Sequence, residues 1–131
     1  MKKNQFNSTL LLKISIATIF LSHAIVRIAN GTIGMFTEFL GLKGFPMPLQ
    51  LVWSITIFEM IGSILLVLGY YTKWISSIFI FILLVGIVII HYANGWFVGE
   101  HGTGGIEYSF LLISVLIAIA FPDRIMIKKH L

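Results

Sequence analysis

Four long apolar runs, almost free of charge, constrain what this chain can fold into. They extend from about residue 10 to 28, 49 to 69, 74 to 92 and 106 to 121. A helix needs about 20 mostly apolar residues to cross a hydrocarbon core about 30 Å thick. The runs are continuous and lack the alternation of barrel strands, so each predicts a helix. We therefore expect an all-α membrane protein, with residues 1–131 forming a single integral membrane domain that folds as a four-transmembrane-helix up-down bundle.

Composition supports this interpretation and excludes most other classes of protein. Hydrophobic residues make up 58% of the chain and charged residues 11%, against about 25% charged in a typical soluble domain. This balance excludes a soluble enzyme, a secreted scaffold, a disordered tail and a nucleic-acid-binding module. The chain has no cysteine, which excludes disulfides, a thiol nucleophile and cysteine-ligated metal or iron–sulfur sites.

The positions of the basic residues predict the orientation of the four spans. Seven of the nine bases fall on the side that holds both termini, and these are Lys2, Lys3, Lys13, Lys73, Arg124, Lys128 and Lys129. Arg27 and Lys43 fall on the other side. The excess predicts cytoplasmic termini in a bacterial-type plasma (inner) membrane, with a multi-pass topology. The formal charge of +4 therefore reflects topology, and no nucleic-acid partner is expected. A cleaved signal peptide is disfavoured, because Lys13 interrupts the first apolar run.

The connection between the first two spans predicts a further element. Apolar residues there alternate with Thr37, Glu38 and Lys43, a pattern typical of a short helix lying in the membrane interface. The apolar members are Ile33, Met35, Phe36, Phe39, Leu40 and Leu42. The Pro46-Met47-Pro48 turn then directs the chain into the second span.

Each span has one stripe of polar or small residues at helical spacing, which we expect to face the interior of the bundle. The stripes in the first two spans are Lys13, Ile16, Phe20, His23 and Arg27, and then Ile55, Glu59, Gly62, Leu66 and Gly69. Those in the last two are Ser77, Ile80, Leu84, Ile87 and His91, and then Glu107, Leu111, Ser114 and Ala118.

Glu59 is the most informative of these residues. It lies ten residues into the second span, about 15 Å deep and near the midplane, where an acid is costly. Helical side chains lean toward their own N-terminus, so Arg27 and Glu59 lean toward each other from antiparallel spans. We expect an ion pair of these two with His23 beside it, in an outward-facing polar pocket. As alternatives, Arg27 reaches the outer headgroups, or Glu59 is a protonated, purely structural group.

The outer segment from His91 to Glu107 is rich in glycine and is a second candidate for the pocket. His91, Glu107 and Trp96 are its candidate substrate residues. A metal site built from His91, His101, Glu100 and Glu107 is disfavoured, because no HExxH-type spacing supports it. Haem held by His23 and His91 is disfavoured as well. We expect no metal and no covalent cofactor. The structural alternative is a flexible turn with Trp96 and Phe97 as an aromatic anchor.

The order and spacing of short motifs over residues 10–122 resemble the DoxX family of small four-helix membrane proteins. The matching elements are His23 with Arg27, Phe39-Leu-Gly before a proline turn, Glu59-x-x-Gly62, Leu66, Leu68-Gly69, Thr72-Lys73, His91-x-x-x-Gly95-Trp-Phe and Glu107-Tyr108. The sequence departs from the family by the inserted Leu42-Lys-Gly-Phe and by Phe121-Pro-Asp-Arg in place of a glycine-rich ending. The resemblance implies redox chemistry, because some members are similar to a subunit of thiosulfate:quinone oxidoreductase and others are linked to thiol or oxidative-stress complexes.

Three functions remain open from the sequence. The first is a redox-associated subunit, such as a subunit of a quinone-dependent oxidoreductase. In it, Glu59 or His23 would exchange protons with a quinone, and Arg27 would hold the reduced oxygen of the quinone. Its partners would be the lipid bilayer and a redox protein. The second is a non-catalytic accessory or docking protein. The third is a small proton-coupled transporter, which is disfavoured because comparable four-helix exporters carry their acid in the first span.

Overall fold

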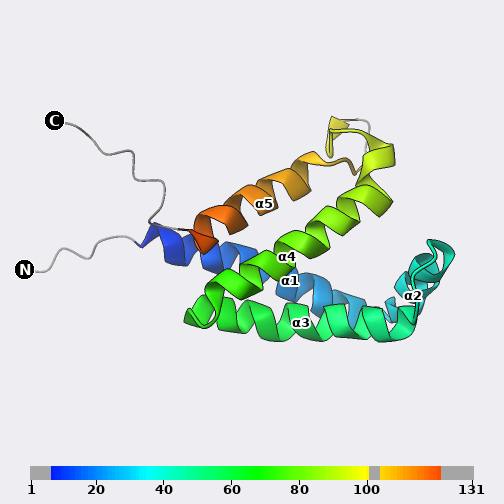
Figure 1. The fold of residues 1–131 in the computed structure, drawn as a ribbon, viewed down its shortest axis with the longest axis horizontal. Coiled ribbons are helices and arrows are strands. Elements are labelled where there is room, and N and C mark those ends of the chain that lie inside the picture. The colour runs from blue at the N-terminus through cyan, green and yellow to red at the C-terminus, as the bar shows by residue number, and fades with distance from the viewer. Residues whose placement is uncertain (1–6, 101–103, 122–131) are drawn as a thin grey trace, which may run out of the picture. The chain divides into compact units, whose positions relative to one another are not determined.

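The computed structural model describes residues 7–100 and 104–121 (Figure 1). All regular secondary structure in these residues is helical, and they contain no strand. The α-helices are α1 (Ser8–Ala29), α2 (Ile33–Leu42), α3 (Pro48–Leu68), α4 (Thr72–Gly86) and α5 (Glu107–Ala120). A π-helix, η1 (Ile87–His91), and a 3₁₀-helix, η2 (Tyr92–Asn94), continue α4. The prediction of an all-α protein is confirmed. Lys2, Lys3, Arg124, Lys128 and Lys129, used above for orientation, and His101 lie outside the described residues.

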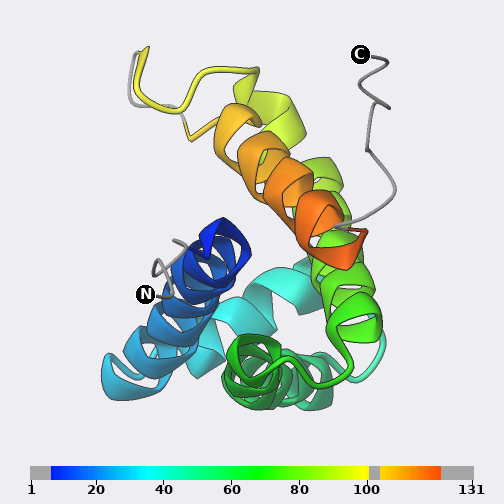
Figure 2. The ribbon, with the colours of Figure 1, turned by 90° about the vertical axis from the view of Figure 1, so that its left-hand side faces the viewer.

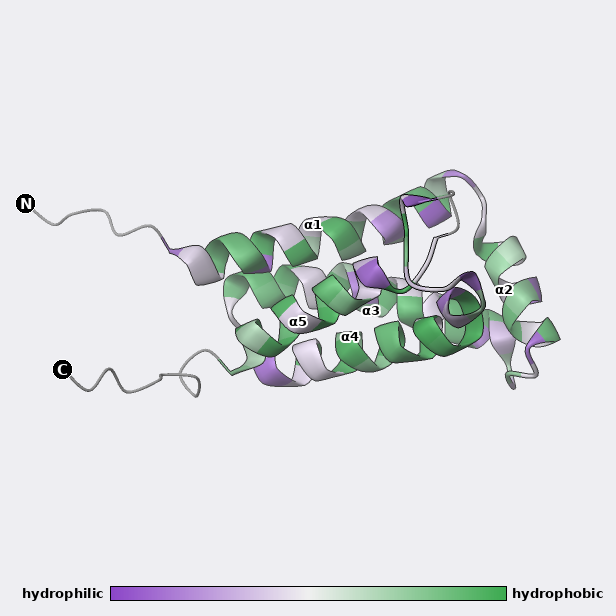
Figure 3. Ribbon diagram, turned by 90° about the horizontal axis from the view of Figure 1, so that it is seen from above, coloured by the Kyte–Doolittle hydropathy of each residue, from purple (hydrophilic) through white to green (hydrophobic). Residues whose placement is uncertain are grey.

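Three helices are long and apolar enough to cross a membrane, namely Ser8–Ala29, Pro48–Leu68 and Thr72–Asn94. Figure 3 colours much of these helices as hydrophobic, with paler and hydrophilic residues between the apolar ones. α5 is apolar but has 14 residues, which rise about 21 Å, less than the hydrocarbon core. The fourth span therefore stays a prediction. α2 forms in the connection where a short interfacial helix is expected, and its place in the interface stays a prediction as well.

The structure divides into two compact units, which are described separately. One consists of Ile14–Tyr70 and holds most of α1 together with α2 and α3. The other holds the first residues of α1 and the chain from Tyr71 onward, with α4 and α5.

In the first of these units, glycine ends each helix in the same way. The amide of the residue after the glycine bonds back to a carbonyl five residues earlier, and the glycine amide bonds to one three residues earlier. The glycines are Gly31 (φ 65°), Gly44 (φ 86°) and Gly69 (φ 85°). This Schellman arrangement needs a left-handed residue, which glycine adopts without steric cost. The sequence thus sets the length of α1, α2 and α3.

The buried faces of α1 and α3 match much of their predicted stripes. Ile16, Phe20 and Ala24 are buried on α1 at four-residue spacing. On α3 the buried residues are Val52, Thr56, Glu59, Gly62, Ser63 and Leu66. The buried face of α3 is therefore polar in the middle of the helix, at Thr56 and Glu59, and consists mainly of small or apolar residues toward both ends.

In the second unit, α4 and α5 lie side by side and antiparallel (Figures 1 and 2), and the ammonium of Lys73 lies 5.3 Å from the centre of the Phe121 ring. The stripes predicted for these two helices are wrong. The buried residues are Ile75, Ser76 and Phe79 on α4, and Ser109, Leu112, Leu116 and Ile119 on α5. Ser77 and Ser114 are exposed, and their hydroxyls donate to the carbonyls of Lys73 and Phe110 four residues earlier. A hydroxyl satisfied in this way does not require a polar interior.

Candidate functional site

An ion pair joins α1 to α3 inside the Ile14–Tyr70 unit. Arg27 in the last turn of α1 donates from Nη1 to Oε2 of Glu59 at 2.7 Å. The same nitrogen donates to the hydroxyl of Thr56 at 2.8 Å. Thr56 lies one turn before Glu59 on α3, so one guanidinium nitrogen binds two consecutive polar positions on that helix. The Thr56 hydroxyl in turn donates to the carbonyl of Val52.

The pair is largely withdrawn from the surface. The side chain of Glu59 is 6% exposed and that of Arg27 is 15% exposed. Phe36 of α2 covers the guanidinium, with its ring centre 5.1 Å from the Arg27 Cζ. A cation over an aromatic face gains about 0.5–2 kcal/mol, with the larger values where water is excluded. Three helices therefore contribute to holding Arg27, and the alternative in which it extends freely to headgroups does not describe this geometry.

The guanidinium retains unused hydrogen-bonding capacity. In the part of the chain that the structure describes, its hydrogen bonds all involve Nη1, whereas arginine carries five N–H donors. Within the described residues, the Nη2 and Nε donors have no hydrogen-bond acceptor. Glu59 likewise receives the Arg27 bond at one of its two oxygens. The arrangement can bind a carbonyl or anionic oxygen and present a carboxylate beside it.

His23 lies one turn before Arg27 on α1, but it is exposed. No hydrogen bond within the described residues joins it to the ion pair. The structure thus brings Arg27 and Glu59 into direct contact and leaves His23 beside them at the surface.

Two residues of this site were missed from the sequence. Thr56 lies three residues before Glu59 and could have been found as a hydroxyl on the same helical face. Phe36 was assigned to the expected short helix, and nothing in its local pattern indicates a contact with Arg27. That contact depends on how α2 folds back, which spacing along the chain does not encode.

The second predicted group, His91, Trp96 and Glu107, holds the loop between η2 and α5. The Nδ1 of His91 lies 2.7 Å from the carbonyl oxygen of Gly104, which can act as an acceptor and so places the proton on Nδ1. Glu107 accepts the amide of Val98 at 2.8 Å. The Trp96 ring packs on Phe110 of α5 with centres 5.4 Å apart. Each residue therefore has a structural partner within its own unit.

Gly105 permits this loop to close. Its amide donates to the carbonyl of Phe97, and the next two amides donate to Gly95 and Trp96. A Cβ at Gly105 would lie 2.6 Å from these backbone atoms. Backbone hydrogen bonds thus hold residues 95–97 against residues 105–107 at the start of α5.

His91 also closes η1, and π-helical turns occur frequently at functional sites. With Nδ1 donating, its Nε2 is left as the acceptor nitrogen in the neutral ring. Among residues 7–100 and 104–121, no three histidine or carboxylate side chains group closely enough to hold a metal ion. His101, one of the four residues considered for such a site, lies outside these ranges.

Comparison with known proteins gives one match. A family model described as DoxX matches residues 8–92, which is more than half of the chain and includes α1, α2, α3, α4 and the π-helical turn. No curated protein and no solved structure matches the sequence. The matched region contains Arg27, Glu59 and Thr56.

Proposed function

This chain belongs to the DoxX family, and from that premise we propose that it is a redox-associated, quinone-linked integral membrane subunit whose polar site is the Arg27–Glu59 pair. Three apolar helices of spanning length accompany this family membership, so the protein is embedded in the lipid bilayer. The finer assignment, to a quinone and a redox partner protein, is our proposal.

The observation that carries the proposal is a largely buried ion pair between two helices of spanning length, in which the guanidinium has donors without an acceptor among the described residues. Charged groups in such a setting are costly, and they commonly mark sites of binding or proton transfer. A quinone oxygen is an acceptor without a donor of its own, so it fits the Nη2 and Nε groups that the internal hydrogen bonds leave unused. When bound, a quinone would supply a carrier for two electrons and two protons.

The residues of the chain would then have distinct roles. Arg27 binds and orients the oxygen, and its positive charge stabilises negative charge that develops there. Glu59 holds or releases a proton next to that oxygen. His23, exposed one turn away, exchanges protons between Glu59 and the surface. His91, Trp96 and Glu107 maintain the loop before α5.

The proposal includes a topology. Both termini lie on the cytoplasmic side of a bacterial-type plasma membrane, α2 lies in the outer interface, and α5 completes a bundle of four spans. The distribution of seven bases against two supports this orientation. Electrons would come from a partner protein, because the residues named here supply proton transfer and binding.

The test is gentle purification from the native membrane, followed by identification of bound quinones and proteins and a measurement of quinone-dependent turnover. Glu59→Gln keeps the shape of the side chain and removes its acid function, so we expect turnover to fall by about 10²-fold or more. Glu38→Gln is the matched control, because Glu38 is an exposed acid on α2. Wild type and the control should retain quinone and activity.

Two results would contradict the proposal. If no quinone co-purifies and added quinone supports no turnover with any co-purified protein, the protein is better explained as an accessory or docking subunit. If proton-coupled uptake into vesicles depends on Glu59 while quinone has no effect, the transporter is favoured.

A further inference from the structure

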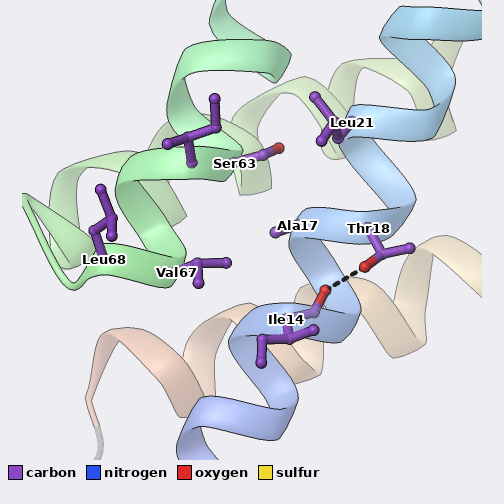
Figure 4. Close-up of a pocket in the computed structure, with 8 residues that line it drawn as sticks. Ile14, Ala17, Thr18, Leu21, Ser63, Val67 and Leu68 are labelled. Carbon is purple, nitrogen blue, oxygen red and sulfur yellow. Dashed lines mark hydrogen bonds between the residues drawn. The ribbon is translucent and has the colours of Figure 1, made fainter.

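An apolar groove runs between α1 and α3 inside the Ile14–Tyr70 unit (Figure 4). It is lined by Ile14, Ala17, Thr18, Leu21, Ser63, Ile64, Val67 and Leu68. The two hydroxyls in its wall are satisfied within their own helices, since Thr18 donates to the Ile14 carbonyl and Ser63 to the Glu59 carbonyl. The groove therefore offers mainly apolar side-chain atoms to a ligand, and neither of its two hydroxyls has a free hydrogen-bond donor.

Small side chains create the groove. Ala17 and Ser63 point into the space between the two helices, and the longer side chains around them form its rim (Figure 4). Leu68 and Ile64 are exposed, so the groove is open along one side. An extended hydrocarbon chain fits this shape, whereas a compact polar ligand would gain no hydrogen bond.

The groove and the polar site follow one another along the same two helices. Ser63 follows Glu59 by one turn and bonds to its backbone carbonyl. Leu21 precedes Arg27 by six residues, about 9 Å along α1. The ion pair and the groove thus occupy consecutive stretches of the same pair of helices, one charged and one apolar. A ligand with a polar head and a long apolar tail matches this sequence of surfaces.

We propose that the groove binds the isoprenoid-type tail of the quinone whose headgroup lies at Arg27 and Glu59, an inference that rests on the proposed function. The lipid around the protein is as apolar as the tail, so burial from water does not drive this contact. Selection comes from shape, because a chain that fills the space beside Ala17 and Ser63 gains dispersion contacts with both α1 and α3. The tail then fixes the direction from which the headgroup reaches Arg27.

The experiment uses the full chain in lipid nanodiscs and a quinone that carries a photoreactive diazirine in its tail. We expect illumination to label residues 14–21 and 63–68, and a long-tailed quinone without the label to prevent this. A tailless quinone of the same headgroup should bind about threefold to tenfold more weakly than the long-tailed one, the size of a modest packing contribution. Phospholipid in excess should not compete.

Thr18→Phe and Ser22→Phe form a matched pair of variants. Both residues are exposed hydroxyls on α1 that donate to a carbonyl of their own helix, but only Thr18 lines the groove. Thr18→Phe should abolish the labelling and bring the affinity for the long-tailed quinone down to that of the tailless one. Ser22→Phe should change neither.

The possible failures are distinguishable. If tailless quinone binds in a Glu59-dependent manner but the tail labels exposed residues evenly, or phospholipid competes equally, the groove proposal is overturned and the proposed function stands. If neither quinone binds, both are overturned. Equal effects of the two phenylalanine variants would also exclude the groove as the tail site.

Discussion

At the scale of single residues, the Arg27–Glu59 pair has the largest energetic consequences. Each charge has lost most of its contact with solvent, and the 2.7 Å contact compensates for that loss while both partners are present. Removing one partner leaves the other charge in an apolar setting. Replacing both residues should therefore cost less stability than the sum of the two single replacements, and this difference can be measured.

We expect Arg27→Met alone to lower the free energy of unfolding in detergent by about 3 kcal/mol, because Glu59 is left unpaired. Adding Glu59→Gln should restore part of this loss, so the double variant should be more stable than the sum of the single effects by at least about 1 kcal/mol. Denaturant unfolding of wild type, both single variants and the double variant gives the coupling directly. Strictly additive effects would show that the two side chains do not interact in the folded protein.

At the scale of elements, the loop from Gly95 to Gly105 determines how α5 begins. Three backbone hydrogen bonds join residues 105–107 to residues 95–97, and the side chain of Glu107 adds a fourth to Val98. The approach is so close that residue 105 cannot carry a side chain. The glycine richness of this segment thus reflects packing at Gly105 and left-handed backbone at Gly95 and Gly104.

Gly105→Ala should destabilise the protein by about 2 kcal/mol, since its Cβ would overlap backbone that cannot move aside as a side chain would. Gly99→Ala is the control in the same loop, because its Cβ meets nothing within 4 Å and its backbone is not left-handed. Thermal unfolding of the two variants checks this. Equal melting temperatures would mean that the loop does not pack in this way.

Polar residues within the helices differ in whether they face the interior. Glu59 lies on a buried face, and Ser77 and Ser114 do not, although all three were used in the same way to orient helices. A carboxylate cannot be satisfied by its own helix backbone, whereas a serine hydroxyl can donate to the carbonyl four residues earlier. Glu59 is therefore a better guide to the inner face of its helix than Ser77 and Ser114 are to the inner faces of theirs.

At the scale of the whole molecule, the positions of aromatic residues along the chain indicate where it crosses the membrane. Exposed aromatic residues occur at both ends of the Thr72–Asn94 segment, with Tyr71 and Trp74 at its start and Tyr92 and Trp96 at or beyond its end. Aromatic residues concentrate at the two membrane–water interfaces. Their separation supports a full crossing by this segment, with the Tyr70–Tyr71 turn on one side and Gly99 on the other.

The absence of cysteine makes this topology simple to test by single-cysteine labelling. In intact cells, a membrane-impermeant maleimide should label Gly99→Cys, because we place this loop outside. Tyr70→Cys should react only after the membrane is permeabilised, since the proposed topology places its turn on the cytoplasmic side. Labelling of Tyr70→Cys from outside would reverse the orientation, and labelling of both from one side would exclude the crossing between them.

The sequence by itself determined the long helices to within two residues of the predicted runs when η1 and η2 are counted with α4, because hydrophobic length and glycine caps act locally along the chain. It also identified Arg27 and Glu59 as partners, since helical lean and charge complementarity depend on position alone. Only the tertiary structure decided that Phe36 and Thr56 complete that site, and that His91 and Glu107 bind backbone within their own loop. These contacts join elements whose approach depends on the packing of whole side chains, which a periodic pattern does not specify.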